Sequence, residues 1–209
     1  GLLLKVHTSN YRIEGFTAEV PARDLADLAR ENGIPLIDDL GSGTLIDLAQ
    51  FGLPHEPTVA EAVAAGADLV TFSGDKMLGG PQAGFIVGRK ALIEKINRNP
   101  MKRALRVDKI RLAAIEATLR LYRDPDSLTQ KLPTCRQLAR GKDEIEACAR
   151  RLAPRVAEAL GADISVEVAD CFSQVGSGSV PVETLPSAGL ALTPVEGGGG
   201  ELDRLAEKL

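Results

Sequence analysis

The first ninety residues alternate between short apolar runs and amphipathic segments. Four runs have the length and composition of buried strands: residues 2–6, 34–38, 68–72 and 84–87. Between them, apolar side chains recur at helical spacing within residues 21–32 and 58–65. Strands that alternate with helices predict an α/β fold with a mainly parallel sheet.

Both helical segments carry signals at their ends. Pro21 suits a first helical turn, and Gly33 ends the segment that follows it. Thr58 is a candidate N-cap, and Glu61 stands three residues later, which is the spacing of a capping box. Gly66 closes this second helix. These signals place one helix before each of two strands, as a parallel sheet requires.

The second half of the chain is mostly helical before it ends in a mixed region. Helical periodicity returns in three segments, residues 90–97, 108–122 and 143–160. Pro154 is expected to kink the last of these or divide it in two. Short strand patterns follow at residues 164–168, 179–183 and 189–193, before a final helix from Glu201. We therefore predict half of a large domain, a helical linker and a small α+β domain, at residues 1–107, 108–142 and 143–209.

Composition narrows the class of protein. The 209 residues are 44% hydrophobic and 26% charged, as in globular domains. No apolar run reaches the roughly 18 residues that cross a bilayer, so we expect a cytoplasmic protein without membrane contact. The net charge of −4 disfavours general nucleic-acid binding. Three cysteines and two histidines, without ligand spacing, predict neither a metal site nor a disulfide framework.

Candidate chemistry gathers where the predicted strands end. In parallel sheets, ligands bind beyond the carboxyl ends of strands, and Asn10, Asp38 and Lys76 each follow one. Lys76 also lies in a glycine-rich loop. A lysine in such a loop can form an imine with an aldehyde cofactor, while a carboxylate keeps a pyridine nitrogen protonated. Together these residues predict pyridoxal 5'-phosphate as the cofactor.

Each neighbouring polar residue has a candidate role and an alternative. Asp38 is assigned to the ring nitrogen because it ends its strand, and Asp39 then points to the opposite face. Capping of the turn is the alternative for this pair. Ser73 precedes Lys76 by three residues and could donate to the cofactor phosphate. Asp75 could orient or activate a substrate group beside the lysine, or cap its own turn.

A basic segment, residues 98–111, follows the sheet. Only Asp108 opposes its six cations: Arg98, Lys102, Arg103, Arg106, Lys109 and Arg111. We expect a loop that binds an oxyanion or a nucleic-acid phosphate, because arginine makes bidentate contacts with such groups. A solvated charged face is the alternative.

Four segments together resemble the bacterial selenocysteine synthases, the L-seryl-tRNA(Sec) selenium transferases: residues 5–13, 37–43, 73–84 and 103–109. The similarity extends over nearly the whole chain, including residues 176–186, and its most specific part is residues 75–82. The resemblance implies a fold-type I (aspartate aminotransferase-like) pyridoxal phosphate enzyme. Its reaction converts seryl-tRNA(Sec) to selenocysteinyl-tRNA(Sec) with selenophosphate, through a dehydroalanyl intermediate.

The resemblance also implies roles and partners. Lys76 corresponds to the cofactor lysine and removes the α-proton, and Asp75 assists beside it. Arg103 and Arg106 correspond to anion-binding arginines suited to selenophosphate. The family assembles as a homodecamer. Its tRNA-binding N-terminal domain, its cofactor-phosphate loop and its last strands have no counterpart here, so we expect a fragment that is inactive by itself.

Two other functions remain open from the sequence. A pyridoxal phosphate-dependent ammonia lyase acting on an amino-sugar acid phosphate would use the same lysine and hold its substrate phosphate with the arginines. The second alternative is a non-catalytic module that kept the fold and serves in assembly or in tRNA binding. A requirement for seryl-tRNA separates selenium transfer from the lyase.

Overall fold

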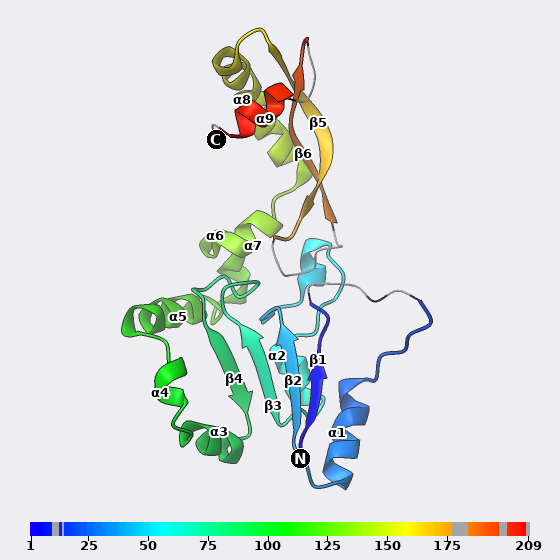
Figure 1. The fold of residues 1–209 in the computed structure, drawn as a ribbon, viewed down its shortest axis with the longest axis vertical. Helices are drawn as coiled ribbons and strands as arrows, with labels where there is room; N and C mark the ends of the chain where they lie inside the picture. Colours follow the sequence, from blue (N-terminus) through cyan, green and yellow to red (C-terminus); the bar gives the residue numbers. More distant parts are fainter. Residues whose placement is uncertain (10–12, 14, 177–183, 197–199, 208–209) are drawn as a thin grey trace. The chain divides into compact units, whose positions relative to one another are not determined.

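The computed structural model describes residues 1–9, 13, 15–176, 184–196 and 200–207 (Figure 1). The chain forms two compact units. One comprises Gly1–Ala139 together with residues 175–176, and the other comprises Arg140–Gln174 together with the described residues from Thr184 onward.

The first unit is built on a four-stranded sheet with the order β1-β2-β3-β4. The strands are Leu3–Val6, Leu36–Gly41, Leu69–Ser73 and Gly84–Gly88. The first three strands are parallel, whereas β4 runs antiparallel to β3. The predicted α/β fold with a mainly parallel sheet is therefore confirmed.

Two helices cover one face of this sheet (Figure 1). They are α1, Ala22–Glu31, and α2, Val59–Ala64. Their small side chains pack on a core whose buried strand residues are Leu36, Leu40, Val70 and Phe72. Full burial of one leucine contributes roughly 2 kcal/mol. This packing holds β2 and β3 side by side.

The predicted capping box at the start of α2 is confirmed. The Thr58 hydroxyl accepts a hydrogen bond from the Glu61 backbone N–H at 3.2 Å, and the Glu61 carboxylate accepts from the Thr58 backbone N–H at 2.8 Å. Both donors would otherwise lack an intrahelical partner. The cap therefore sets the point at which the chain enters the helix.

Short helices follow the sheet in the first unit. They are α3 (Lys90–Asn97), α4 (Lys102–Leu105), α5 (Lys109–Leu121), α6 (Leu128–Lys131) and α7 (Pro133–Leu138), with 3-10 turns at Leu48–Phe51 and Pro125–Ser127. The expectation of a continuous basic loop over residues 98–111 is wrong, because α4 lies within it. Asp108 caps α5 by accepting from the Ile110 and Arg111 N–H groups, each at 2.9 Å.

Sequence periodicity did not predict α6 and α7. Four to six residues are too few to display a helical repeat, and helices this short depend on tertiary packing. That packing is a small core of Leu128, Leu132 and Cys135, against which Tyr122 also lies.

The second unit combines one long helix with a two-stranded ribbon. Helix α8, Lys142–Leu160, packs against the antiparallel strands β5, Ile164–Gln174, and β6, Thr184–Pro194, and α9 spans Gly200–Ala206. The strands expected at residues 164–168 and 189–193 are therefore longer than predicted. The strand expected at 179–183 lies outside the described residues.

Helix α8 is not divided at Pro154, so that alternative is wrong. A proline removes one backbone donor, and packing on β5 and β6 retains the rest of the helix. Among the described helices, none has both the length and the apolar character required to cross a membrane.

Candidate active site at the carboxyl ends of the parallel strands

The carboxyl ends of β1, β2 and β3 meet at one edge of the sheet, and backbone hydrogen bonds connect the segments that leave them. The His7 N–H donates to the Asp39 carbonyl at 2.8 Å, which extends the β1–β2 ladder. The Met77 N–H donates to the Ser42 carbonyl at 3.2 Å. The residue before Met77 is Lys76, so the lysine backbone lies beside the exit of β2.

The lysine loop, residues 74–83, joins β3 to β4. Its ends are paired, since the Gly74 N–H donates to the Ala83 carbonyl at 2.8 Å. Met77 and Leu78 are buried, whereas Lys76 is half-buried and Asp75 is exposed. The loop therefore holds Lys76 on a backbone that is anchored directly after it.

Helix α5 also anchors the lysine loop. The Tyr122 hydroxyl donates to the Leu78 carbonyl at 2.9 Å, and burial raises the pKa of Tyr122 far above its usual range. Gly79 has a φ of +72°, and a Cβ there would lie 2.8 Å from the Thr134 hydroxyl oxygen. Glycine is required at this position because both the conformation and the space exclude a side chain.

Asp38 is the most unusual polar residue of the site. Its exposed fraction is 2%, and its Oδ1 has no hydrogen-bond partner among the described residues. Burial raises the pKa of this carboxyl group. An unsatisfied buried acceptor costs about 1–3 kcal/mol, so native structures rarely keep one without a functional reason. A ligand with a hydrogen-bond donor would satisfy it.

The prediction that Asp38 ends its strand is wrong. Strand β2 continues to Gly41, so Asp38 is an interior residue, opposite Lys5 on one side and Val70 on the other. Aspartate has a low strand propensity, but pairing with two neighbouring strands overrides it. Burial alternates along β2, so Asp39 lies on the other face of the sheet and is half-buried. Its carboxylate accepts a hydrogen bond from the Gly41 N–H at 3.3 Å. Of the two aspartates, Asp38 is the one with a buried carboxylate oxygen that has no partner among the described residues.

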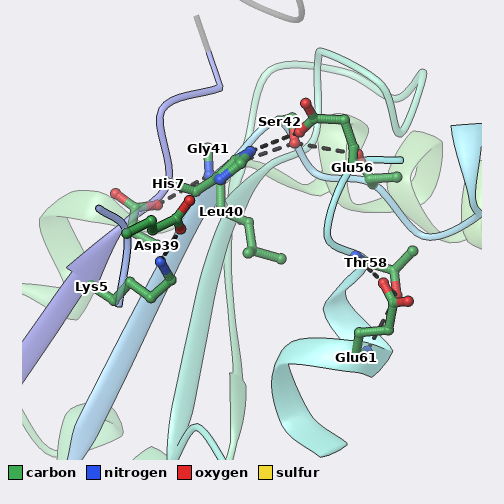
Figure 2. Close-up of polar contacts among 11 residues, drawn as sticks. Lys5, His7, Asp39, Leu40, Gly41, Ser42, Glu56, Thr58 and Glu61 are labelled. Carbon is green, nitrogen blue, oxygen red and sulfur yellow. Dashed lines mark hydrogen bonds and ion pairs between the residues drawn. The ribbon is translucent and has the colours of Figure 1, made fainter. Parts of the chain in front are cut away.

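Two cations that sequence reasoning missed lie beside Asp38 at the end of β1. Figure 2 shows the His7 imidazole directed at Glu56, with Nε2 and Oε2 2.8 Å apart. The Lys5 ammonium group forms an ion pair with Glu19. The available signal was a lysine inside a short strand and a histidine two residues later, directly after the strand, a spacing at which both side chains face the same side.

The remaining predicted site residues lie at separate places. Ser73 is the half-buried last residue of β3. Arg103 lies in α4 and Arg106 directly follows that helix, and both are exposed. Asn10 lies outside the described residues. The structure thus places Asp38 and Ser73 on the neighbouring strands β2 and β3, and Lys76 on the loop that follows β3. It places the two arginines on another element.

Asp38→Asn is expected to increase the free energy of unfolding at neutral pH, without added ligand, by about 1 kcal/mol. Because burial raises the pKa of Asp38 above its ordinary 3.8, its ionised form destabilises the fold. This loss of stability is absent below pH 3.8 and is complete once the pH exceeds the raised pKa that Asp38 has in the folded protein. Urea unfolding at several pH values measures the effect.

Asp39→Asn is the matched control for this experiment. Its half-buried carboxylate has a backbone partner that an amide oxygen can keep, so the expected change is within about 0.5 kcal/mol. A less stable Asp38→Asn protein at neutral pH would contradict the interpretation of Asp38 as an unpaired buried charge.

The chain shares its α/β fold with part of a larger enzyme of known structure. A solved structure described as D-glucosaminate-6-phosphate ammonia-lyase matches with a TM-score of 0.50 and 22% identity. The match covers 96% of this chain and 42% of that one. At this identity the similarity establishes the fold alone.

Sequence comparison identifies the family. The family described as L-seryl-tRNA selenium transferase (SelA) matches residues 1–209, and the chain belongs to it. Proteins described as L-seryl-tRNA(Sec) selenium transferase are 66% identical in Methylocella silvestris and 64% identical in Rhizobium meliloti. These matches cover 100% and 98% of this chain and 44% of each relative, so the chain spans less than half of their length. The predicted family membership is confirmed.

Proposed function

We propose that this chain carries the cofactor lysine of a pyridoxal phosphate-dependent selenium transferase. The whole protein would convert L-seryl-tRNA(Sec) to selenocysteinyl-tRNA(Sec), with selenophosphate as the selenium donor. The observation that carries the proposal is 66% identity, over all 209 residues, to a relative described as that transferase. The unpaired carboxylate of Asp38 supports the cofactor assignment independently.

The described residues fit pyridoxal phosphate. The buried Oδ1 of Asp38 lacks a donor among the residues that the structure describes, and the protonated ring nitrogen is a donor of the required kind. The Lys76 amine, on the adjacent loop, is the group that bonds to the aldehyde. Ser73, and in our proposal Asn10, contribute polar contacts to the cofactor. When bound, the cofactor withdraws electrons from the substrate carbon that loses its proton.

The residues of the lysine loop would have different roles in the reaction. The Lys76 amine would accept the α-proton of the seryl group. Asp75 is exposed beside it and is suited to orient the substrate. In the net change, a selenol group would replace the β-hydroxyl group of the seryl residue, and selenophosphate would be converted to phosphate. The exposed guanidinium groups of Arg103 and Arg106 are suited to bind the anionic selenium donor.

The same proposal includes the cellular setting of the reaction. Seryl-tRNA(Sec) is the macromolecular partner, a homodecamer is the assembly and the cytoplasm is the location. The family description names L-seryl-tRNA, which supports the first of these points. The two other functions considered have less support: the ammonia-lyase match extends only to the fold, and a non-catalytic module gives no reason for the unpaired carboxylate of Asp38.

The test is a product assay with the full-length protein. Incubation with seryl-tRNA(Sec) and selenophosphate is expected to yield selenocysteinyl-tRNA(Sec), detected by mass spectrometry of the released amino acid. D-glucosaminate-6-phosphate, supplied without tRNA, is expected to release no ammonia. Ammonia release from the sugar acid, together with no change in the seryl group, would contradict the proposed function and favour the lyase.

A further inference from the structure

Asp38 shares one face of the sheet with two cationic side chains. Lys5 is its partner in the β1–β2 register, and side chains of paired residues in neighbouring parallel strands point to the same face. His7 comes two residues after Lys5 and continues the ladder through its N–H bond to Asp39, so it also faces that side. The buried carboxylate therefore has two basic neighbours.

Each of these cations has its own acidic partner, and the side chains of both are largely buried. The exposed fractions of the Lys5 and His7 side chains are 14% and 15%. Lys5 pairs with Glu19, and His7 with the equally buried Glu56. The hydrogen bond to Glu56 raises the pKa of His7, which favours the charged imidazolium.

Four charged groups act on Asp38 besides burial itself. Burial raises the pKa of Asp38. The charges of Lys5 and His7 lower this pKa, whereas the charges of Asp39 and Glu19 raise it. Neither cation is hydrogen-bonded to Asp38 within the described part of the chain, so both act through charge and leave Oδ1 available. A charge acting through a poorly solvated region is weakly screened.

We propose that His7, held in its charged form by Glu56, and Lys5 are positioning residues that keep Asp38 ionised, so that its unpaired Oδ1 accepts the N–H of the cofactor ring. A protonated Asp38 would place a second donor against that N–H and weaken the contact. This inference depends on the proposed cofactor for its purpose, but the ionisation of Asp38 can be measured without the cofactor.

The first measurement follows Asp38 directly. In the cofactor-free, full-length protein with carbon-13-labelled aspartate carboxyl groups, NMR titration gives its protonation midpoint, assigned by the loss of the signal in Asp38→Asn. His7→Gln is expected to move the midpoint to higher pH, because a nearby positive charge is lost. Lys5→Met is expected to move it in the same direction. His55→Gln, which alters an exposed histidine paired with Asp47 and Glu61, is expected to leave it unchanged.

A double variant separates two effects of His7→Gln: the loss of the positive charge of His7 and the loss of the ion-pair partner of Glu56. His7→Gln leaves Glu56 unpaired, and an unpaired carboxylate could itself raise the pKa of Asp38. His7→Gln combined with Glu56→Gln removes both charges and is expected to retain an upward displacement, because His7 and not Glu56 is among the groups that act on Asp38. An unchanged or lower midpoint in either His7 variant would overturn the inference.

The second measurement follows the cofactor contact. Affinity is measured against pH for pyridoxal phosphate and for an analogue whose ring nitrogen is replaced by carbon. His7→Gln is expected to weaken pyridoxal phosphate binding on the acid side, by up to about tenfold for each pH unit of displacement, and to leave the analogue unaffected. Equal weakening of both ligands would show a structural role and overturn the inference.

The two proposals fail in distinguishable ways. If the wild-type protein did not bind pyridoxal phosphate, the proposed function would be wrong, while the NMR titration would still decide whether His7 and Lys5 control the charge of Asp38. If the cofactor bound normally and the Asp38 midpoint did not respond to His7→Gln, the function would stand and this inference would be wrong.

Discussion

Lys76→Ala is expected to abolish the visible absorbance band that pyridoxal phosphate gives when it bonds to a protein amine. In the wild-type protein, borohydride reduction followed by mass spectrometry is expected to locate the pyridoxyl group on the peptide that contains Lys76. Turnover is expected to fall by about a hundredfold to ten-thousandfold, the range for loss of a general base. The reason is that Lys76 is half-buried and its backbone is anchored at the exit of β2, the strand that carries Asp38.

Two further variants show whether the effect is specific to this amine. Lys76→Arg keeps the positive charge but cannot bond to the aldehyde, so the band is expected to be lost as in Lys76→Ala. Lys90→Ala removes an exposed lysine of α3, whose ammonium group lies 3.8 Å from the Glu94 carboxylate, and is expected to keep the band. A full band in Lys76→Ala would disprove the assignment of the cofactor lysine.

Gly43→Ala is expected to lower the free energy of unfolding by about 4 kcal/mol, at the upper end for one substitution. The φ angle of Gly43 is +73°, in the left-handed region. A Cβ at this position would overlap the Ser73 carbonyl oxygen and lie 3.1 Å from the Ser73 carbonyl carbon. Because the obstacle is backbone, β2 and β3 would have to separate where they leave the sheet. Urea unfolding measures the loss.

Gly33→Ala is the matched control for the close approach between residue 43 and the Ser73 backbone. Its φ angle of +63° is also left-handed, but a Cβ there would have no neighbour within 4 Å. The expected cost is therefore only that of the backbone conformation, about 1 kcal/mol. Equal losses in the two variants would show that the contact between residue 43 and Ser73 adds nothing. In the full-length protein, Gly43→Ala is also expected to weaken pyridoxal phosphate binding, because it displaces Asp38 relative to Lys76.

Features that depend on neighbours along the chain were predictable from the sequence. The capping box of Thr58 and Glu61 and the helix it begins were found because every partner lies within four residues. The strands before Asp38 and Lys76 were found because short apolar runs between helices are typical of parallel strands. The glycine-rich setting of Lys76 was predictable for the same reason.

The antiparallel direction of β4 and the extent of β2 were decided by pairing between strands. β2 was predicted to stop at Asp38, yet its ladder with β1 and β3 carries it to Gly41. Strand propensity describes one residue, whereas a ladder depends on backbone groups that belong to segments about thirty residues away in the sequence.

The sequence by itself determined the family, the class of fold, the position of Lys76 in a glycine-rich loop and the nature of the groups around it. These follow from residue type and local spacing. Only the tertiary structure decided that Asp38 is buried with an unpaired oxygen and that Lys5 and His7 share its face. The physical reason is that solvation and charge interactions depend on distances in space, and these are set when separate strands pair and exclude water.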